Sequence, residues 1–393
     1  MIRFYAIVFL LFPTAIFGQD INKSKITVNN YCDTIPFEYI RGKIIVNVEV
    51  NNQQKRFIFD TGAPCLISEN LLHTTNAPVV GTGIITDVTG RNQQQQIVKV
   101  PELKLGNVPF TDVVAIVFDR QSTGLLDCFD FDGFIGSTLL KHCIVQINLE
   151  QKNIILTDRL TRLDLREASK SKIKLDGNSR PFIKLDLGQQ GNLTALFDSG
   201  SDKFLPLSTE GYEKLNAKGD VFLVNEGYGS VSSGLFGAGK MGIERRIKID
   251  NVFFGNAVIK DILTTVSEHK NKSAVGLALA KYGVITVDYL HKRFYFAPHS
   301  ESQTFQELPF FGFNAQLING VYTVSAVYKN TEAEKLGLRN GYRITKINDF
   351  DLSDNQRDSL CELFLSNYLE RETMKVSFVD SFGNSNTIEI KGQ

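Results

Sequence analysis

The stretch Phe57-Ile58-Phe59-Asp60-Thr61-Gly62-Ala63-Pro64 decides the fold of this chain. An apolar run typical of a buried strand ends there at an acid, a hydroxyl and a glycine. A single Asp-Thr-Gly is more often a turn, because Asp and Thr side chains bond nearby backbone and Gly tolerates positive φ. The same pattern returns at Leu196-Phe197-Asp198-Ser199-Gly200-Ser201, so the interpretation depends on whether Asp60 and Asp198 meet.

A β-hairpin is expected before each of these two acids. Residues 43–50 alternate in polarity, Asn51-Asn52 form a turn, and residues 55–59 return toward Asp60. In the same way, residues 182–187, a turn at 188–192 and a strand at 193–197 lead into Asp198. The two acids therefore stand at the ends of matching strands.

The likeness continues downstream of both acids. Residues 103–110 are echoed by 247–254, Phe134-Ile135-Gly136 by Ala274-Val275-Gly276, and 144–156 by 284–296, in the same order and at nearly constant spacing. Such a series indicates an internal duplication. We therefore expect two homologous β lobes at residues 37–158 and 176–298, joined by the charged stretch 159–174. Duplicated lobes usually associate about a pseudo-twofold axis, which would bring Asp60 and Asp198 together.

The length and charge of the chain limit the number of domains and the kinds of partner to expect. At 393 residues it is too long for one core and should form two or three domains. Lys plus Arg equals Asp plus Glu, at 43 each, so no net field favours nucleic acid or an anionic membrane. No basic helix or RNA-binding aromatic motif is present, and no nucleic-acid partner is expected.

The N-terminal residues resemble a secretory signal. Arg3 precedes an apolar stretch at residues 5–17, which ends at the small residue Gly18 and is too short to span a bilayer. A buried N-terminal strand is the alternative. No later apolar run reaches about 18 residues, the length a membrane span needs. We therefore expect a signal peptide at 1–18 and a mature chain exported to the periplasm, cell surface or medium, without a transmembrane segment.

The chain has five cysteines, so at least one is unpaired. Cys128 and Cys143 flank one loop and are the first candidate disulfide, although buried free thiols are an equally open reading. The five histidines are scattered without ligand spacing, so neither a metal site nor a cofactor is expected.

Two carboxylates at hydrogen-bonding distance have a specific chemistry. They cannot both ionise easily, so the pair holds one proton between them. Such a pair can bind a water, deprotonate it with the charged member and protonate a scissile amide with the other. Gly62 and Gly200 would let the backbones approach closely, and the Thr61 and Ser199 hydroxyls would tie each loop to the opposite one.

Residues 37–298 resemble the bilobal aspartic proteases, the pepsin and retropepsin-like group. The resemblance rests on the two acid motifs and on Asp132-Gly133-Phe134-Ile135-Gly136 with its echo. It implies a catalytic pair of Asp60 and Asp198, a lytic water, a cleft between the lobes and peptide or protein substrates. Residues expected to support the two acids are Thr61, Gly62, Ser199, Gly200 and Ser201. Residues expected to thread beside the acid loops are Phe134, Ile135, Gly136, Val275 and Gly276.

The first-lobe flap departs from the pepsin pattern. The matching hairpin, residues 83–100, has no aromatic residue, and its turn lies near Thr89 and Gly90. It is closer to the glycine-rich flap of retropepsins. Ala63 also lacks a hydroxyl that would stabilise the Asp60 carboxylate, so we predict a pair less acid-shifted than in pepsin.

After a polar linker at 299–306, residues 304–393 read as a small α+β domain that resembles a PDZ domain. Phe310-Phe311-Gly312-Phe313 resembles its carboxylate-binding loop, so Phe311, Gly312 and Phe313 are expected to capture a C-terminal peptide. The alternative is a core strand with a bulge. The sequence thus predicts a mainly β, exported aspartic endopeptidase with a PDZ-like recruiting domain. Its rival is an inactive protease-like scaffold that binds peptides.

Overall fold

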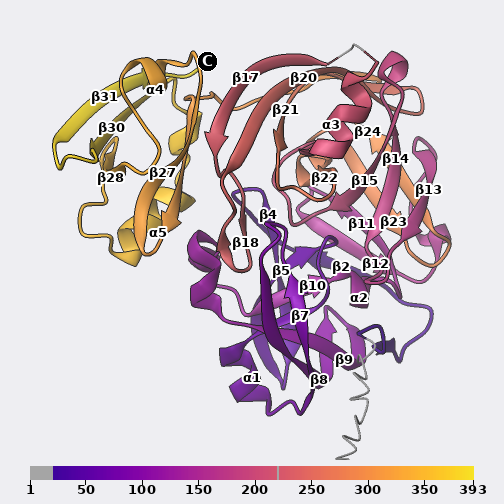
Figure 1. The fold of residues 1–393 in the computed structure, drawn as a ribbon. Coiled ribbons are helices and arrows are strands. Elements are labelled where there is room, and N and C mark those ends of the chain that lie inside the picture. The colour runs from indigo at the N-terminus through magenta and orange to yellow at the C-terminus, as the bar shows by residue number, and fades with distance from the viewer. Residues whose placement is uncertain (1–20, 219–220) are drawn as a thin grey trace, which may run out of the picture.

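The computed structural model describes residues 21–218 and 221–393, so the predicted signal peptide lies outside it. Within these ranges the fold is mainly β, as predicted from the sequence (Figure 1). Two β lobes lie one above the other, and a smaller C-terminal domain lies beside them. None of the described helices is both long and apolar enough to cross a membrane.

The first lobe is built on one mixed sheet, in which the hairpin leading to Asp60 is central. Its described strands are β1 (Lys25–Ile26), β3 (Glu38–Ile40), β4 (Lys43–Val50), β5 (Gln53–Asp60), β6 (Leu66–Ser68), β7 (Val79–Thr86), β8 (Asn92–Leu105), β9 (Val108–Phe118) and β10 (Gly133–Gly136). Its helical segments are α1 (Glu69–Thr75), the 3₁₀ segment η1 (Arg120–Phe129) and α2 (Ser137–Leu140).

The second lobe repeats this order of elements. Its strands are β14 (Pro181–Asp186), β15 (Asn192–Asp198), β16 (Leu207–Ser208), β17 (Phe222–Gly229), β18 (Ser233–Gly234), β19 (Gly237–Ala238), β20 (Gly242–Phe254), β21 (Ala257–Ser267) and β22 (Ala274–Gly276). Helix α3 (Thr209–Asn216) and the 3₁₀ segments η3 (Gly188–Gln190) and η4 (Leu277–Lys281) accompany them.

A sheet shared by both lobes marks the pseudo-twofold axis. It consists of β2 (Cys32–Pro36), β11 (Ile144–Asn148), β12 (Asn153–Thr157), β13 (Ser169–Leu175), β23 (Gly283–Asp288) and β24 (Arg293–Pro298). Strand β11 pairs antiparallel with β23, so that Gln146 faces Thr286 and donates a hydrogen bond of 3.0 Å to its hydroxyl. These two positions correspond in the sequence repeat, so the duplicated segments meet each other at the axis.

The apolar run before Asp60 is continuous because β5 is buried on both faces. Phe57 and Phe59 belong to the large core that extends through both lobes, whereas Ile58 points into a smaller apolar cluster with Phe118, Phe129, Phe131 and Phe134. Successive side chains of a strand point to opposite faces, so a strand between two cores needs apolar residues throughout. Burial on both faces fixes the position of β5, and with it the position of Asp60 at the end of that strand.

The C-terminal domain has its own apolar core. Its elements are β26 (Phe313–Ile318), β27 (Val321–Tyr328), α4 (Glu332–Lys335), β28 (Arg343–Ile347), β29 (Phe350–Asp351), α5 (Arg357–Leu365), η5 (Tyr368–Glu370), β30 (Thr373–Val379) and β31 (Ser385–Lys391). The expected linker is partly ordered against the second lobe, because β25 (Ser302–Thr304) pairs with β21. In addition, β27 pairs with β17, so the sheet of the second lobe continues into the domain.

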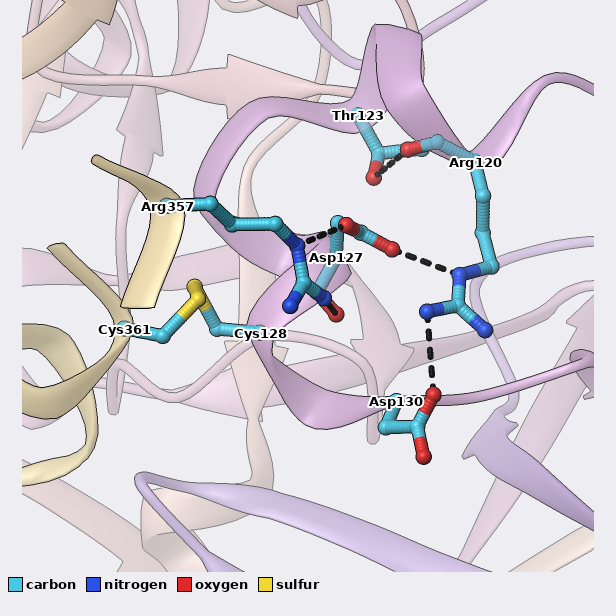
Figure 2. The surroundings of a disulfide bond; sticks show 7 residues. All are labelled: Arg120, Thr123, Asp127, Cys128, Asp130, Arg357 and Cys361. Carbon is cyan, nitrogen blue, oxygen red and sulfur yellow. Dashed lines mark hydrogen bonds and ion pairs between the residues drawn. A yellow bond between two sulfur atoms is a disulfide. The ribbon is translucent and has the colours of Figure 1, made fainter. Parts of the chain in front are cut away.

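The predicted disulfide between Cys128 and Cys143 is wrong. Cys128, in η1, is bonded to Cys361 on α5 of the C-terminal domain, as Figure 2 shows. Cys143 is a buried free thiol in the core of the lobes, as is Cys65. The spacing of cysteines around a loop could not predict this pairing. The pairing depends on how the C-terminal domain, more than two hundred residues away in sequence, docks on the first lobe.

Candidate active site

Each acid stands at the end of a strand that is supported by a parallel neighbour. Strand β10 pairs with β5 so that Gly136 lies beside Asp60, and Phe134 and Ile135 lie beside the two residues before it. Strand β22 pairs with β15 in the same way, with Val275 beside Phe197 and Gly276 beside Asp198. The residues expected to thread beside the acid loops occupy those places.

The glycines of the supporting strands are required by close backbone contacts. A side chain at Gly136 would collide with the Pro64 carbonyl, and one at Gly276 would collide with the Lys203 carbonyl. Ser201 belongs to the same arrangement, because its carbonyl accepts a hydrogen bond of 2.7 Å from Leu277. The loops and their supports are thus packed backbone against backbone.

The structure brings the two carboxyl groups together. Asp60 and Asp198 are hydrogen-bonded to each other through their side chains. A methyl group at Gly62 would lie 2.5 Å from Asp198 Oδ1, and one at Gly200 would collide with the Asp60 carboxyl. Each acid also accepts a hydrogen bond from the backbone N–H of the glycine two residues on, at 2.7 Å for Gly62 and 3.0 Å for Gly200.

The Thr61 and Ser199 hydroxyls cross-link the two acid loops. Thr61 Oγ1 donates to the Phe197 carbonyl at 2.7 Å and accepts from the Ser199 N–H at 3.0 Å. Ser199 Oγ donates to the Phe59 carbonyl at 3.0 Å and accepts from the Thr61 N–H at 2.9 Å. Both residues are fully buried, so each hydroxyl satisfies two groups that water cannot reach.

Replacing either hydroxyl should therefore destabilise the protein. Thr61→Ala leaves the Phe197 carbonyl and the Ser199 N–H without partners, and each orphaned buried group costs about 1–3 kcal/mol. We expect the free energy of unfolding in urea to fall by about 2–6 kcal/mol. Thr61→Ser keeps the hydroxyl and is the matched control, which should lose much less. Equal stability of Thr61→Ala and Thr61→Ser would contradict this interpretation.

The electrostatics of the pair favour one retained proton. Burial of Asp60, followed by the neighbouring Asp198, raises the pKa of Asp60 to about 8, although the Gly62 N–H and the Lys43 charge act in the opposite direction. The pair is consequently suited to hold one proton at neutral pH.

Lys43 and Asp202, which lie beside the pair, were not predicted from the sequence. Lys43 begins β4 in the first lobe, and its ammonium donates a hydrogen bond to the Gly200 carbonyl in the second. Burial works against ionisation of Asp202, but the charges of Lys43 and Lys203 hold the pKa of Asp202 below its usual value. In the repeat, Arg180 precedes β14 and pairs with Asp176 instead, at 2.6 Å. A lysine at the start of an alternating strand gave no signal of this role.

The flap hairpin of β7 and β8 contacts the second lobe. Thr89 and Gly90 lie in its turn, where Asp87 Oδ1 accepts hydrogen bonds from Thr89 N at 2.9 Å and Thr89 Oγ1 at 2.6 Å. Asp87 Oδ2 accepts from Phe236 N, in the second lobe, at 3.0 Å. Asp87 was not singled out from the sequence, although an Asp two residues before a Thr-Gly is a known turn-capping pattern.

The residues expected to bind a peptide carboxylate are used within the C-terminal domain. Phe311 is buried in its core, Gly312 packs against Thr331 with a φ of +77°, and Phe313 pairs with Val327. Both α5 and β26 contact η1 of the first lobe, and Leu125 of η1 packs against the core of the domain. Peptide capture by this domain stays a prediction.

Across residues 21–218 and 221–393 no group of His, Cys, Asp and Glu side chains is arranged to hold a metal ion. The polar side chains at the acid pair are carboxyl, hydroxyl and ammonium groups, which can transfer protons and form hydrogen bonds.

Comparisons with known proteins relate part of the chain to one family. A family model described as aspartyl protease matches residues 46–137. No curated protein sequence matches the chain. Basic 7S globulin from soybean is similar in structure, with a TM-score of 0.42 and 9% identity over 68% of this chain and 95% of that one. Conglutin gamma, a basic 7S globulin from lupine seeds, gives a TM-score of 0.40 and 11% identity over 70% and 96%. The family match thus relates residues 46–137, the segment of the first lobe that carries Asp60, to an aspartyl protease-like domain.

Proposed function

We propose that this protein is an exported aspartic endopeptidase. The observation that carries the proposal is the hydrogen-bonded pair of Asp60 and Asp198, contributed by equivalent loops of two lobes. The cross-linking hydroxyls hold this geometry, and the retained proton supplies the acid that amide hydrolysis requires.

In the proposed reaction, a water is held between the two carboxyl groups. The charged member of the pair accepts a proton from the water, and the resulting hydroxide adds to the carbonyl carbon of the scissile peptide. The protonated member donates its proton to the amide, so that the C–N bond breaks and an amine leaves. Each positioned proton transfer contributes about 10²–10⁴ in rate.

Export is supported by two independent features. Residues 1–18 carry the charge, apolar core and small-residue end of a secretory signal. The Cys128–Cys361 disulfide belongs to the chemistry of oxidising compartments. We propose peptides or unfolded segments of exported proteins as the substrates.

The proposal is tested with a peptide library incubated with the protein between about pH 3 and about pH 10. We expect endoproteolytic cleavage that pepstatin blocks and that a metal chelator leaves unchanged. Cleavage that resists pepstatin and survives in both Asp60→Asn and Asp198→Asn would assign the activity to another site or to a contaminant.

The pH profile should depend on Lys43. Asp60 acts as an acid only while protonated, so kcat/KM should fall as pH rises through about 8. The Lys43 charge lowers the pKa of Asp60, so Lys43→Met should move this alkaline limb to higher pH, whereas Lys43→Arg should leave it in place. Lys184→Met, at an exposed position of β14, is the control for a general charge effect. A profile that peaks well below pH 4, or a limb that moves to lower pH, would contradict the assignment.

A further inference from the structure

We propose that the C-terminal domain is a brace that positions the loop of the second lobe on which the first-lobe flap rests. It fixes this loop, residues 230–239, which we call the roof loop. The roof loop binds the β-turn at the end of the first-lobe flap, residues 87–91, which we call the flap tip. The effect on cleavage rests on the proposed function, but the effect on flap motion does not.

The flap tip binds the roof loop through both polar backbone groups of Phe236. Asp87 Oδ2 accepts from the Phe236 N–H at 3.0 Å, and Arg91 Nη1 donates to the Phe236 carbonyl at 3.3 Å. Asp87 Oδ1 meanwhile accepts from the backbone N–H of Thr89 and Arg91, which shapes the turn. Gly234 packs so closely on Asp87 that a side chain there would collide with the carboxylate.

The roof loop also reaches the apolar surface beside the acid loop. Phe236 is buried, and Leu235 packs against the cluster formed by Phe118, Phe129, Phe131 and Phe134. Ala63, three residues after Asp60, packs against the same cluster, as does Ile85 of the flap. Flap, roof loop and acid loop therefore share one apolar support.

The C-terminal domain holds the base of the roof loop. Ser230 N donates to the Ser325 carbonyl at 2.8 Å, and Ser325 Oγ donates to the Ser230 carbonyl at 2.7 Å. Asn314 Nδ2 donates to the same carbonyl at 3.3 Å, and Gln316 Nε2 donates to the Ser232 carbonyl at 2.9 Å. Strands β17 and β27 pair immediately before the loop, and Figure 1 shows the loop descending from β17 and β20 toward the first lobe.

A second attachment joins the domain to η1 of the first lobe. The Cys128–Cys361 disulfide is flanked by Arg357, which donates to Asp127 Oδ2 at 2.7 Å and to the Asp127 carbonyl at 3.0 Å (Figure 2). The rings of Phe129 and Phe364 pack edge to face, with centroids 5.4 Å apart.

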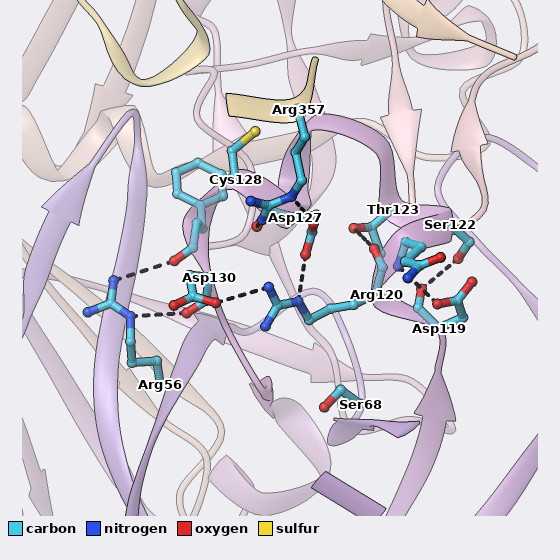
Figure 3. Close-up of polar contacts among 12 residues, drawn as sticks. Arg56, Ser68, Asp119, Arg120, Ser122, Thr123, Asp127, Cys128, Asp130 and Arg357 are labelled. Carbon is cyan, nitrogen blue, oxygen red and sulfur yellow. Dashed lines mark hydrogen bonds and ion pairs between the residues drawn. The ribbon is translucent and has the colours of Figure 1, made fainter. Parts of the chain in front are cut away.

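Segment η1 is itself fixed to the first lobe and touches the roof loop. Figure 3 shows Arg120 bonded to Asp127 and Asp130, and Arg56 bonded to backbone carbonyls of the same segment. Ser122 Oγ donates to the Leu235 carbonyl at 3.2 Å. The roof loop is thus held from the domain side, from η1 and from the flap.

This arrangement assigns the domain a positioning role. The roof loop contains only the two short strands β18 and β19, and a segment with so few internal bonds opens locally unless its surroundings fix it. A roof that is ordered before substrate arrives spares the entropy of ordering it during binding. The two attachments of the domain supply that order from outside both lobes.

Hydrogen exchange of the full-length protein tests the brace without any substrate. In the double variant Asn314→Ala/Gln316→Ala, amides at the flap tip should exchange at least about tenfold faster, because two hydrogen bonds that oppose local opening are removed. Asp87→Ala, which breaks the flap contact directly, should give the same pattern. Glu389→Ala, an exposed position on β31 of the same domain, is the matched control and should leave exchange unchanged.

Exchange at β5 and β15 reports whether the lobes remain folded in each variant. Unchanged flap-tip exchange in the double variant, with Asp87→Ala giving the increase, would overturn the brace. If the protein cleaves peptides, kcat/KM should fall in step with the exchange change in both variants. If it cleaves none, the proposed function fails while the exchange result still decides the brace.

Discussion

Asp60→Asn and Asp198→Asn are each expected to lower kcat/KM for peptide cleavage by at least about 10³-fold. Asparagine has nearly the shape of aspartate but can neither accept the proton of the water nor donate one to the amide. The pair acts as a unit, so the double variant should be no worse than either single one. The measurement is initial-rate cleavage of one peptide from the library, at pH 6 and 7.

Loss of activity should not come from unfolding. The pKa of Asp60 is raised to about 8 in the folded protein, so the folded carboxyl keeps its proton at neutral pH while the unfolded one ionises. The wild type therefore loses stability as pH rises from about 4 toward 8. A neutral amide in place of the acid avoids that loss, and Asp60→Asn should be at least as stable as the wild type at pH 7. Asp250→Asn, at an exposed site on β20, is the matched control and should retain full activity.

Three outcomes separate the candidate functions. Cleavage by the wild type alone supports the endopeptidase. Equal turnover in the wild type and both variants ends the assignment to this pair. Peptide binding without turnover in any of the proteins favours the rival, a protease-like scaffold.

The pairing of the two acids could be predicted because the internal repeat is visible in short stretches of the sequence. Each acid follows an apolar run, a glycine follows each acid, and the strands that support them recur in the same order. Once a duplication is recognised, symmetry alone predicts that Asp60 and Asp198 meet. The hydroxyls of Thr61 and Ser199 followed from the same reasoning, since equivalent loops that face each other must satisfy each other's buried groups.

The features that break the symmetry could not be predicted in this way. Lys43 reaches across to Gly200, whereas Arg180, at the start of the equivalent hairpin, stays with Asp176. The contacts of the roof loop and the docking of the C-terminal domain on η1 depend on the relative placement of three folded units. No periodicity or motif encodes that placement, and the disulfide prediction was wrong for the same reason.

Cys361→Ser is expected to weaken the attachment of the C-terminal domain strongly. Cys128 and Cys361 are separated by 233 residues, and in the chain-entropy model a cross-link closing so long a loop stabilises the folded state by about 5 kcal/mol. Loss of a native disulfide typically costs about 2–5 kcal/mol, and structure retained in the unfolded chain reduces the effect below the chain-entropy value. We expect a loss in that range for the free energy of global unfolding in urea, followed by hydrogen exchange at β30 and β31.

The wild type treated with a dithiol reductant should behave like Cys361→Ser, and the reductant should have no further effect on the variant. Cys32→Ser removes an exposed free thiol and is the matched control, which should unfold like the wild type. If Cys361→Ser unfolds at the wild-type urea concentration without reductant, the disulfide does not hold the domain. Its other contacts with η1, through Arg357 and Phe364, would then be sufficient. If the domain loosens, the roof loop loses its attachment to the domain through Asn314, Gln316 and Ser325, and flap-tip exchange should rise together with the exchange of β30.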